Sequence, residues 1–305
     1  MAPAFTVASV QPDELAPAFE MIFRLHPEAE RRTRVANALN LVRQGDLISE
    51  GIWVARRGKR LSGAMVCLPL VGASALVWPP QVLAGVESRE AEDLLMQRAG
   101  DWMRGRGVKL AQALLTAEES HLAPPLVRNG FTHITSLCYL RHHLHFNTAS
   151  LPAEESLTYR AYPTVSPEVF QQTLGRTYEG TLDCPEVNGV RTLEEVLAGH
   201  RASALHDPKR WWLALDGNKP VGVLLATASA ETHGWDLAYV GVIPEARGRG
   251  VGRELVRKVL FEARAADAEC VTLSVDTRNR PAWKLYLALG FEPDDRREVY
   301  LAVWR

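Results

Sequence analysis

Residues 235–252 read Trp-Asp-Leu-Ala-Tyr-Val-Gly-Val-Ile-Pro-Glu-Ala-Arg-Gly-Arg-Gly-Val-Gly and combine three features in a fixed order. The first eight residues suit a half-buried strand, and Pro244 ends it because proline has no N–H for the ladder. Glycines at 248, 250 and 252 then open a helix whose apolar residues recur at helical spacing. Because glycines admit a ligand close to the backbone and a helix N-terminus favours an anion, the stretch predicts a phosphate-binding site.

Two common phosphate loops do not fit this stretch. A P-loop requires Gly-x-x-x-x-Gly-Lys-Ser/Thr, which is absent, and the Rossmann pattern fails because Arg253 stands where its third glycine belongs. The pattern Arg-x-x-Gly-x-Gly from Arg247, after a strand ending in Val-x-Val, resembles the acetyl-CoA signature of the GNAT acetyltransferase superfamily. A second motif, Asn-x-x-Ala-x-x-Leu-Tyr-x-x-x-Gly-Phe from Asn279 to Phe291, resembles the next motif of that family.

The resemblance covers the chain from about Thr158 onward, and a repeat extends it. Gly130-Phe131 and Gly290-Phe291 stand 160 residues apart, and the same offset aligns the apolar faces of two helices and one strand. The sequence therefore predicts an α/β (α+β) fold of two tandem GNAT-like domains, each a mixed, mostly antiparallel sheet flanked by helices. We expect domains at 1–145 and 156–305, with residues 141–155 between them.

The first copy lacks the residues that the resemblance associates with chemistry. At the offset of 160, Arg247 and the three loop glycines fall on Glu87, Ser88, Glu90 and Glu92, and Tyr286 falls on Leu126. Carboxylates suit a helix start but repel a pyrophosphate. We expect a degenerate first domain and a catalytic second one, an arrangement that resembles the mycothiol synthases, whose acceptor is a small cysteinyl amino-sugar.

The resemblance implies a role for each motif residue. The backbone of the strand at 240–242 pairs with the pantetheine arm of acetyl-CoA, and the N–H groups of 247–252 hold its pyrophosphate. Asn279 hydrogen-bonds the cofactor, and Tyr286 protonates the leaving thiolate unless it is simply a core aromatic. The expected cofactor-binding residues are Val240, Gly241, Val242, Arg247, Gly248, Arg249, Gly250, Val251, Gly252 and Asn279.

A general base and an acceptor site are harder to assign. Asp236 begins the cofactor strand, where histone-acetylating relatives carry a glutamate base, but aspartate reaches less far. His233 and Glu179 are alternatives, and water can relay the proton. The acid-rich segment from Tyr178 to Gly189 is expected to contact the acceptor amine through Glu179 and Asp183, or else to be an ordinary solvated loop.

Composition limits the remaining classes of protein. The net charge of −1 gives no case for nucleic acid or an anionic membrane, and neither a secretory signal nor a spanning segment is evident. Four scattered cysteines suggest buried thiols and a cytoplasmic location. His142, His143 and His145 lack a ligand spacing, so no metal is expected.

The predicted activity is transfer of an acetyl group from the cosubstrate acetyl-CoA to a primary amine of a small molecule or peptide. A non-catalytic acyl-CoA-binding or sensing protein is the alternative, since a sensor needs the phosphate loop but no proton donor. A scaffold of two inactive domains is opposed by the intact glycine loop. The sequence does not indicate an oligomeric state.

Overall fold

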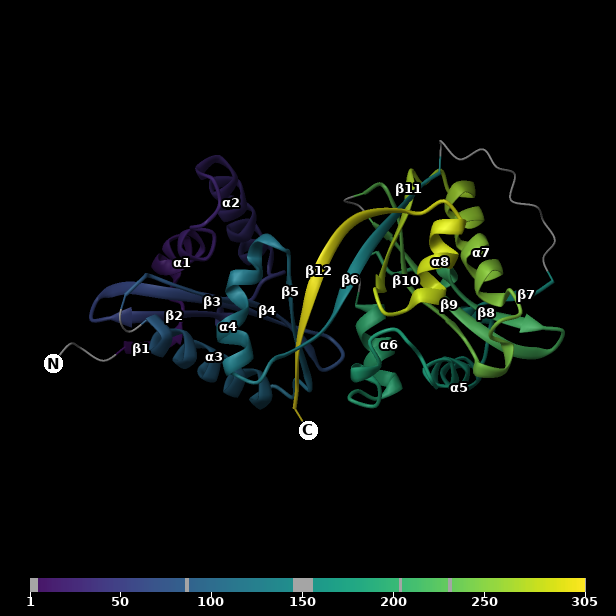
Figure 1. The fold of residues 1–305 in the computed structure, drawn as a ribbon, viewed down its shortest axis with the longest axis horizontal. Coiled ribbons are helices and arrows are strands. Elements are labelled where there is room, and N and C mark those ends of the chain that lie inside the picture. Colours follow the sequence, from purple (N-terminus) through teal and green to yellow (C-terminus); the bar gives the residue numbers. More distant parts are fainter. Residues whose placement is uncertain (1–4, 86–87, 145–155, 203–204, 230–231, 305) are drawn as a thin grey trace. The chain divides into compact units, whose positions relative to one another are not determined.

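A computed structural model describes residues 5–85, 88–144, 156–202, 205–229 and 232–304. The chain forms two compact units, one of residues 1–134 together with 298–305 and one of residues 135–297. Each unit is a sheet with helices on both faces, in the element order of Figure 1.

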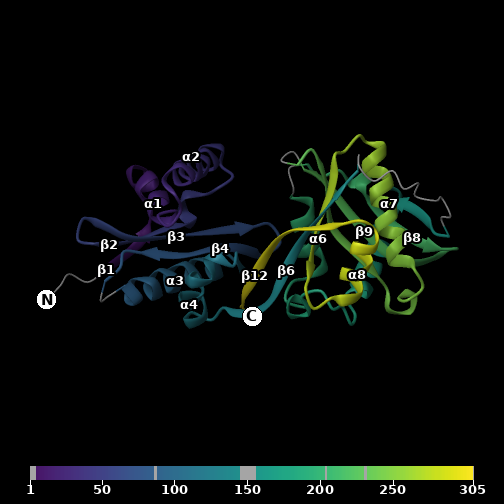
Figure 2. The ribbon, with the colours of Figure 1, turned by 45° about the horizontal axis from the view of Figure 1, so that its top comes forward.

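The first unit places its first four strands antiparallel in chain order, and β5 then joins β4 in parallel. Helices α1 and α2 cover one face of this sheet, and α3 and α4 cover the other, as Figure 2 shows. Its elements are β1 (Phe5–Ser9), α1 (Leu15–Ile22), α2 (Glu28–Gln44), β2 (Ile52–Arg57), β3 (Arg60–Leu70), β4 (Ser74–Val82), α3 (Ser88–Gly105), β5 (Leu110–Leu115) and α4 (Ala123–Arg128).

The second unit repeats this arrangement. Strands β7 to β10 are antiparallel neighbours in chain order, and β11 joins β10 in parallel. The remaining elements of the chain, of which β6 and β12 each extend into the first unit, are β6 (Thr132–His143), β7 (Thr158–Ala161), α5 (Pro167–Thr177), α6 (Leu193–Arg201), β8 (Trp211–Asp216), β9 (Lys219–Ser229), β10 (Gly234–Val242), α7 (Val251–Ala265), β11 (Cys270–Asp276), α8 (Arg280–Ala288) and β12 (Glu292–Val303).

The structure confirms the predicted tandem repeat of the fold. Strands β4 and β10 have bounds 160 residues apart, as do β6 and β12. The pairing of Ala75 with Ala111 in the first unit recurs at the same offset as Trp235 with Val271 in the second. An identical register across two parallel pairs requires the same backbone path in both copies.

The contiguous boundaries drawn from the sequence, 1–145 and 156–305, do not follow the compact units. Residues 298–303 of β12 pair with β5 in the first unit, whereas residues 137–143 of β6 pair with β11 in the second. Each repeat therefore supplies the last strand of the other repeat's sheet. The segment expected to link the domains also begins later than predicted, because β6 continues to His143.

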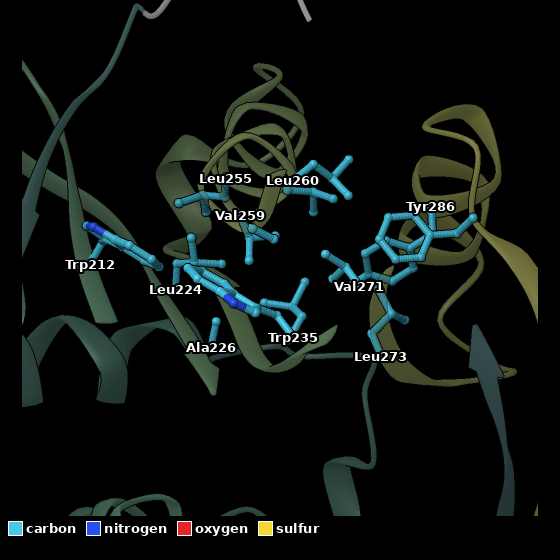
Figure 3. Packing of buried hydrophobic residues seen from close by; sticks show 14 of the residues in the cluster. Trp212, Leu224, Ala226, Trp235, Leu255, Val259, Leu260, Val271, Leu273 and Tyr286 are labelled. Atoms are coloured by element: carbon cyan, nitrogen blue, oxygen red, sulfur yellow. The ribbon is translucent and has the colours of Figure 1, made fainter. Parts of the chain in front are cut away.

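The larger core of the second unit lies between its sheet and helices α7 and α8. In Figure 3, Leu255, Val259 and Leu260 of α7 point toward Leu224 and Trp235 of the sheet. All of them are buried, as the helical spacing of the apolar residues predicts. A second cluster on the opposite face packs α5 and α6 against β8 and β9, so α5 and α7 are fixed on opposite faces of one sheet.

Candidate active site

The candidate site forms where two parallel strands separate. β10 and β11 pair only at Trp235–Val271 and Asp236–Thr272, whereas on its other side β10 stays paired with β9 as far as Val242. A bulge at Ala238 bends β10 at the point of separation. Within the described strands, the edge of β10 that faces β11 is therefore unpaired after Asp236, and such an edge can accept an extended ligand as an added strand.

A cleft of about 760 Å³ fills this opening. It is bounded by β10, β11, the loop before α7, the start of α8 and the segment after α5. Its lining is Thr177, Gly180–Asp183, Leu237–Val242, Arg247, Gly248, Gly250, Gly252, Arg253, Leu273–Val275, Asn279, Pro281, Ala282, Leu285 and Tyr286. Most of the predicted site residues thus line one cleft.

The glycine loop presents backbone N–H groups to the cleft. Gly248 and Gly250 have φ of 73° and 85°, a region that favours glycine, and Gly250 caps α7 without a side-chain hydrogen bond. In the described part of the chain, the N–H groups of residues 248–252 donate to no protein acceptor. Unsatisfied donors at a helix N-terminus form a site for an anion.

The three arginines in and beside this loop, Arg247, Arg249 and Arg253, have different surroundings. The Arg247 guanidinium bonds backbone carbonyls, including the carbonyl of Thr177 at 3.0 Å, and Arg249 pairs with the exposed Asp216 at 2.7 Å. Arg253 is exposed and lines the cleft. Val251 is buried in the core, so only its backbone is available to a ligand.

Tyr286 is both packed in the core and part of the cleft lining. Its side chain is 6% exposed, and its ring packs edge-on to Phe291 at 5.7 Å. It also lines the cleft, and within the described residues its hydroxyl has no hydrogen-bond partner. Burial, followed by the nearby Asp183 carboxylate, raises the pKa of Tyr286, so the hydroxyl keeps its proton at neutral pH.

Asn279 lies at the start of α8. Its Oδ1 accepts a hydrogen bond from the N–H of Ala282 at 3.3 Å, so the residue caps the helix. It also lines the cleft. The asparagine of the second motif therefore has a structural task in addition to any contact with a ligand.

The structure separates the candidate bases. Asp236 is the last residue of β10 that pairs with β11, and its carboxylate accepts a hydrogen bond from Thr272 at 3.2 Å. Burial raises the pKa of Asp236, against the effect of that bond. Asp236 does not line the cleft, and neither do the exposed Glu179 and His233.

Asp183 is the single carboxylate among the residues that line the cleft. Its Oδ1 accepts the N–H of Asp276 at 2.8 Å. Burial raises the pKa of Asp183, against hydrogen bonds from the Asp276 backbone and the Asn279 side chain. The segment that was expected to contact the acceptor thus brings one acid into the cleft, while Glu179 stays outside.

Asp276 does not line the cleft, but its backbone N–H holds Asp183, which does, and the sequence analysis missed it. Its fully buried carboxylate accepts hydrogen bonds from Thr135 at 2.6 Å, from Cys184 N at 3.0 Å and from Arg278 at 2.7 Å. Although burial raises the pKa of Asp276, the bonds from Arg278 and Thr135 outweigh it and lower the pKa to about 2. The signal in the sequence is an aspartate directly after a buried strand, followed two residues later by arginine.

Among the described residues, no three His, Cys, Asp or Glu side chains gather as metal ligands do. His142 is buried against Phe291, with ring centroids 5.2 Å apart, and His145 lies outside the described ranges. Searched over the same ranges, no helix has both the length and the apolar character that crossing a bilayer requires.

Comparison with known proteins defines the class. Residues 176–291 match the Acetyltransferase (GNAT) family, so the chain contains a GNAT-family domain in this region. The mycothiol acetyltransferase of Thermomonospora curvata is 37% identical over 109 residues, which cover 36% of this chain and 36% of that protein. The chain therefore matches little more than a third of that relative's length.

Solved structures extend the likeness of fold to the whole chain. A GCN5-related N-acetyltransferase from Sphaerobacter thermophilus has a TM-score of 0.64 at 18% identity, covering 99% of this chain and 97% of that chain. A tandem GNAT protein from the clavulanic acid biosynthesis pathway has a TM-score of 0.52 at 17% identity, covering 98% of each chain. The fold is the tandem GNAT fold.

Proposed function

We propose that the second unit transfers an acetyl group from acetyl-CoA to a primary amine of a small molecule or peptide. One observation carries the proposal: among the residues that the structure describes, one cleft combines an unpaired strand edge, a row of unsatisfied N–H groups and a tyrosine hydroxyl without a partner. The edge suits the amide groups of the pantetheine arm, and the N–H groups suit a pyrophosphate. The proposed reaction uses no metal ion.

The proposed reaction uses few side chains. Acetyl-CoA supplies an activated thioester; the C–N bond forms as the C–S bond breaks. Tyr286 is proposed to donate its proton to the leaving sulfur: its raised pKa keeps the hydroxyl protonated at neutral pH, and within the described residues the hydroxyl has no other hydrogen-bond partner. The amine proton passes to a carboxylate whose pKa burial raises above its usual value, either Asp183 in the cleft wall or, through water, Asp236 at the point of strand separation.

The acceptor is proposed to approach beside the segment after α5. Asp183 contributes a buried carboxylate there, which suits the positive charge of an incoming amine. Glu179 is exposed and can contact only the outer part of such an acceptor. The relatedness to mycothiol acetyltransferase favours a small acceptor, such as an amino-sugar derivative.

The first unit is proposed to serve structure and not to bind acetyl-CoA. Leu126, the counterpart of Tyr286, is fully buried. Glu92, the counterpart of Gly252, pairs with Arg128 at 2.7 Å, and Glu119, the counterpart of Asn279, accepts the N–H of Thr116 at 3.0 Å. Glu87 lies outside the described residues.

Titration calorimetry with acetyl-CoA tests the binding step. We expect about one molecule per chain, and we expect Gly250→Glu to abolish binding because its φ of 85° disfavours any side chain and the new carboxylate repels a pyrophosphate. Two equivalent sites per chain would contradict the proposed role of the first unit. A screen of amine acceptors that reads thiol release then separates enzyme from sensor: binding without turnover of any amine would favour the sensor.

A further inference from the structure

The side chain of Arg247 is used in a way that the glycine-loop motif does not indicate. Its Nε donates to the carbonyl of Val242 at 3.1 Å and its Nη1 to that of Gly180 at 3.2 Å. Its Nη2 donates to the carbonyls of Thr177 at 3.0 Å and Glu179 at 2.6 Å. Four hydrogen bonds to backbone carbonyls occupy most of the five N–H donors of a guanidinium.

Three of these carbonyls, those of Thr177, Glu179 and Gly180, lie at or just after the C-terminal end of α5, and the fourth, that of Val242, lies at the end of β10. α5 ends at Thr177, and the last carbonyls of a helix have no intrahelical partner and carry partial negative charge. In the described part of the chain, Arg247 has no carboxylate partner. Its charge is therefore balanced mainly by the end of α5 and the backbone that follows, which it caps from the side of the glycine loop.

The segment that Arg247 holds forms one wall of the cleft. Residues 180–183 line it, ending at the Asp183 carboxylate. The far end of the segment is fixed separately, because Cys184 N donates to buried Asp276, and Glu186 pairs with Arg278 at 2.6 Å. Residues 177–186, here named the clamped segment, are thus held at one end by the glycine loop and at the other by the end of β11.

We propose that Arg247 is a positioning residue that couples the cofactor loop to the acceptor side of the cleft. Its backbone lies in the loop proposed to hold the pyrophosphate, while its side chain fixes the segment that carries Asp183. A ligand that orders the loop therefore also orders the clamped segment, and the coupling is reciprocal. This inference rests on the proposed function only in taking acetyl-CoA as the ligand of the loop.

Direct binding of phosphate by the guanidinium is the competing role for Arg247. It would require the side chain to release carbonyls at the end of α5, leaving them without partners. Exposed Arg253, which also lines the cleft, is better placed for that purpose. The two roles differ in what substitution does: loss of a phosphate ligand weakens acetyl-CoA binding, whereas loss of the clamp loosens residues 177–186.

Amide hydrogen exchange and calorimetry on the full chain distinguish them. In Arg247→Gln we expect exchange in the clamped segment at least about tenfold faster than in wild type, with acetyl-CoA affinity within about threefold. In wild type, added acetyl-CoA should slow exchange in this segment about fivefold or more. In Arg247→Gln that slowing should be lost. Arg247→Lys keeps the charge but not the planar guanidinium, so its exchange rate in the clamped segment should lie between those of wild type and Arg247→Gln.

Arg176→Gln is the matched control. Arg176 stands in the last turn of the same helix but forms an exposed pair with Glu245, so its loss should leave exchange in the clamped segment unchanged. Hydrogen exchange in β8 reports whether each variant keeps its fold. If Arg247→Gln does not keep it, exchange in the clamped segment of Arg247→Lys distinguishes the two roles of Arg247.

Unchanged exchange in both Arg247 variants, or equal slowing by acetyl-CoA in wild type and Arg247→Gln, would overturn the inference. A tenfold or larger loss of affinity without loosening would make Arg247 a phosphate ligand. If wild type fails to bind acetyl-CoA, the proposed function is wrong, and the ligand-free comparison still tests the clamp.

Discussion

At the scale of single residues, the glycine-loop motif combines backbone and side-chain functions that its letters do not separate. Gly248 and Gly250 are explained by positive φ, and the N–H groups around them remain available to an anion. Arg247 instead acts through its side chain on carbonyls of another element. The motif predicted where a ligand would lie, but not which groups were already engaged, because hydrogen-bond partners distant in sequence leave no local pattern.

Tyr286→Phe tests the proposed proton donor. The substitution keeps the ring and its edge-on contact with Phe291 and removes only the hydroxyl. Because positioned acid catalysis contributes about 10²–10⁴-fold, turnover should fall by that order while acetyl-CoA affinity changes little. Steady-state kinetics and calorimetry on one preparation provide the measurement. Full turnover in the variant would assign the proton to water or another acid.

Asp236→Asn tests the candidate base through stability as well as rate. Burial raises the folded-state pKa of Asp236 above its unfolded value, so the favourable contribution of the protonated acid is complete at low pH and is lost as pH rises through the folded pKa. The asparagine stays neutral, so the free energy of unfolding of the variant relative to wild type should increase from pH 4 to pH 7. Urea unfolding at both values measures this.

The rates of Asp236→Asn and Asp183→Asn assign the amine proton. Replacing the carboxylate that accepts the proton with the neutral amide should lower turnover by about 10²–10⁴-fold. The rise of the rate with pH through the pKa of that carboxyl, on the acidic limb of the pH profile, should also disappear in that variant alone. Retained turnover in both would indicate proton transfer through water.

At the scale of elements, the sequence predicted the strand and the helix on either side of the glycine loop but not the close approaches between elements. Strand-forming residues before Pro244 predicted β10, and apolar residues at helical spacing predicted α7. The separation of β10 from β11 was not predictable from propensity, because propensity describes each strand alone and does not indicate how far two strands stay paired. The packing of α5 on β10 was equally hidden: a Cβ at Gly241 would lie 2.6 Å from the Cβ of Thr177.

Gly241→Ala and Gly252→Ala form a matched pair in the same cleft. At Gly241 the new methyl overlaps the end of α5, so that helix must move, at a cost of about 1–3 kcal/mol. At Gly252, inside α7, a Cβ meets Val242 at 3.9 Å, an ordinary contact, and alanine favours the helix by up to about 1 kcal/mol. Thermal unfolding should therefore separate the two variants in opposite directions; equal destabilisation would contradict the packing of α5 on β10.

At the scale of the whole molecule, the exchange of last strands distinguishes this chain from two independent copies. The offset of 160 makes β6 and β12 equivalent, so alignment alone does not tell which of them completes which sheet. Their side chains differ: Cys138 and Leu140 of β6 are buried in the core beneath α7, where the equivalents in β12 are Glu298 and Tyr300. Burying Glu298 unpaired in that core would be costly, which favours the exchanged arrangement.

Two fragments test the exchange. Residues 156–305, the domain boundaries drawn from the sequence, lack the β6 residues that pair with Cys270–Asp276 and the Thr135 hydroxyl that bonds Asp276. Residues 135–297 keep both. We expect the second fragment to unfold cooperatively and to bind acetyl-CoA, and the first to show no cooperative transition, because its β12 would have to place Glu298 where Cys138 packs. Circular dichroism melts and calorimetry make the comparison. A stable 156–305 fragment with wild-type affinity would show that β12 can replace β6 beside β11. The second unit would then not require the exchange of last strands in order to fold.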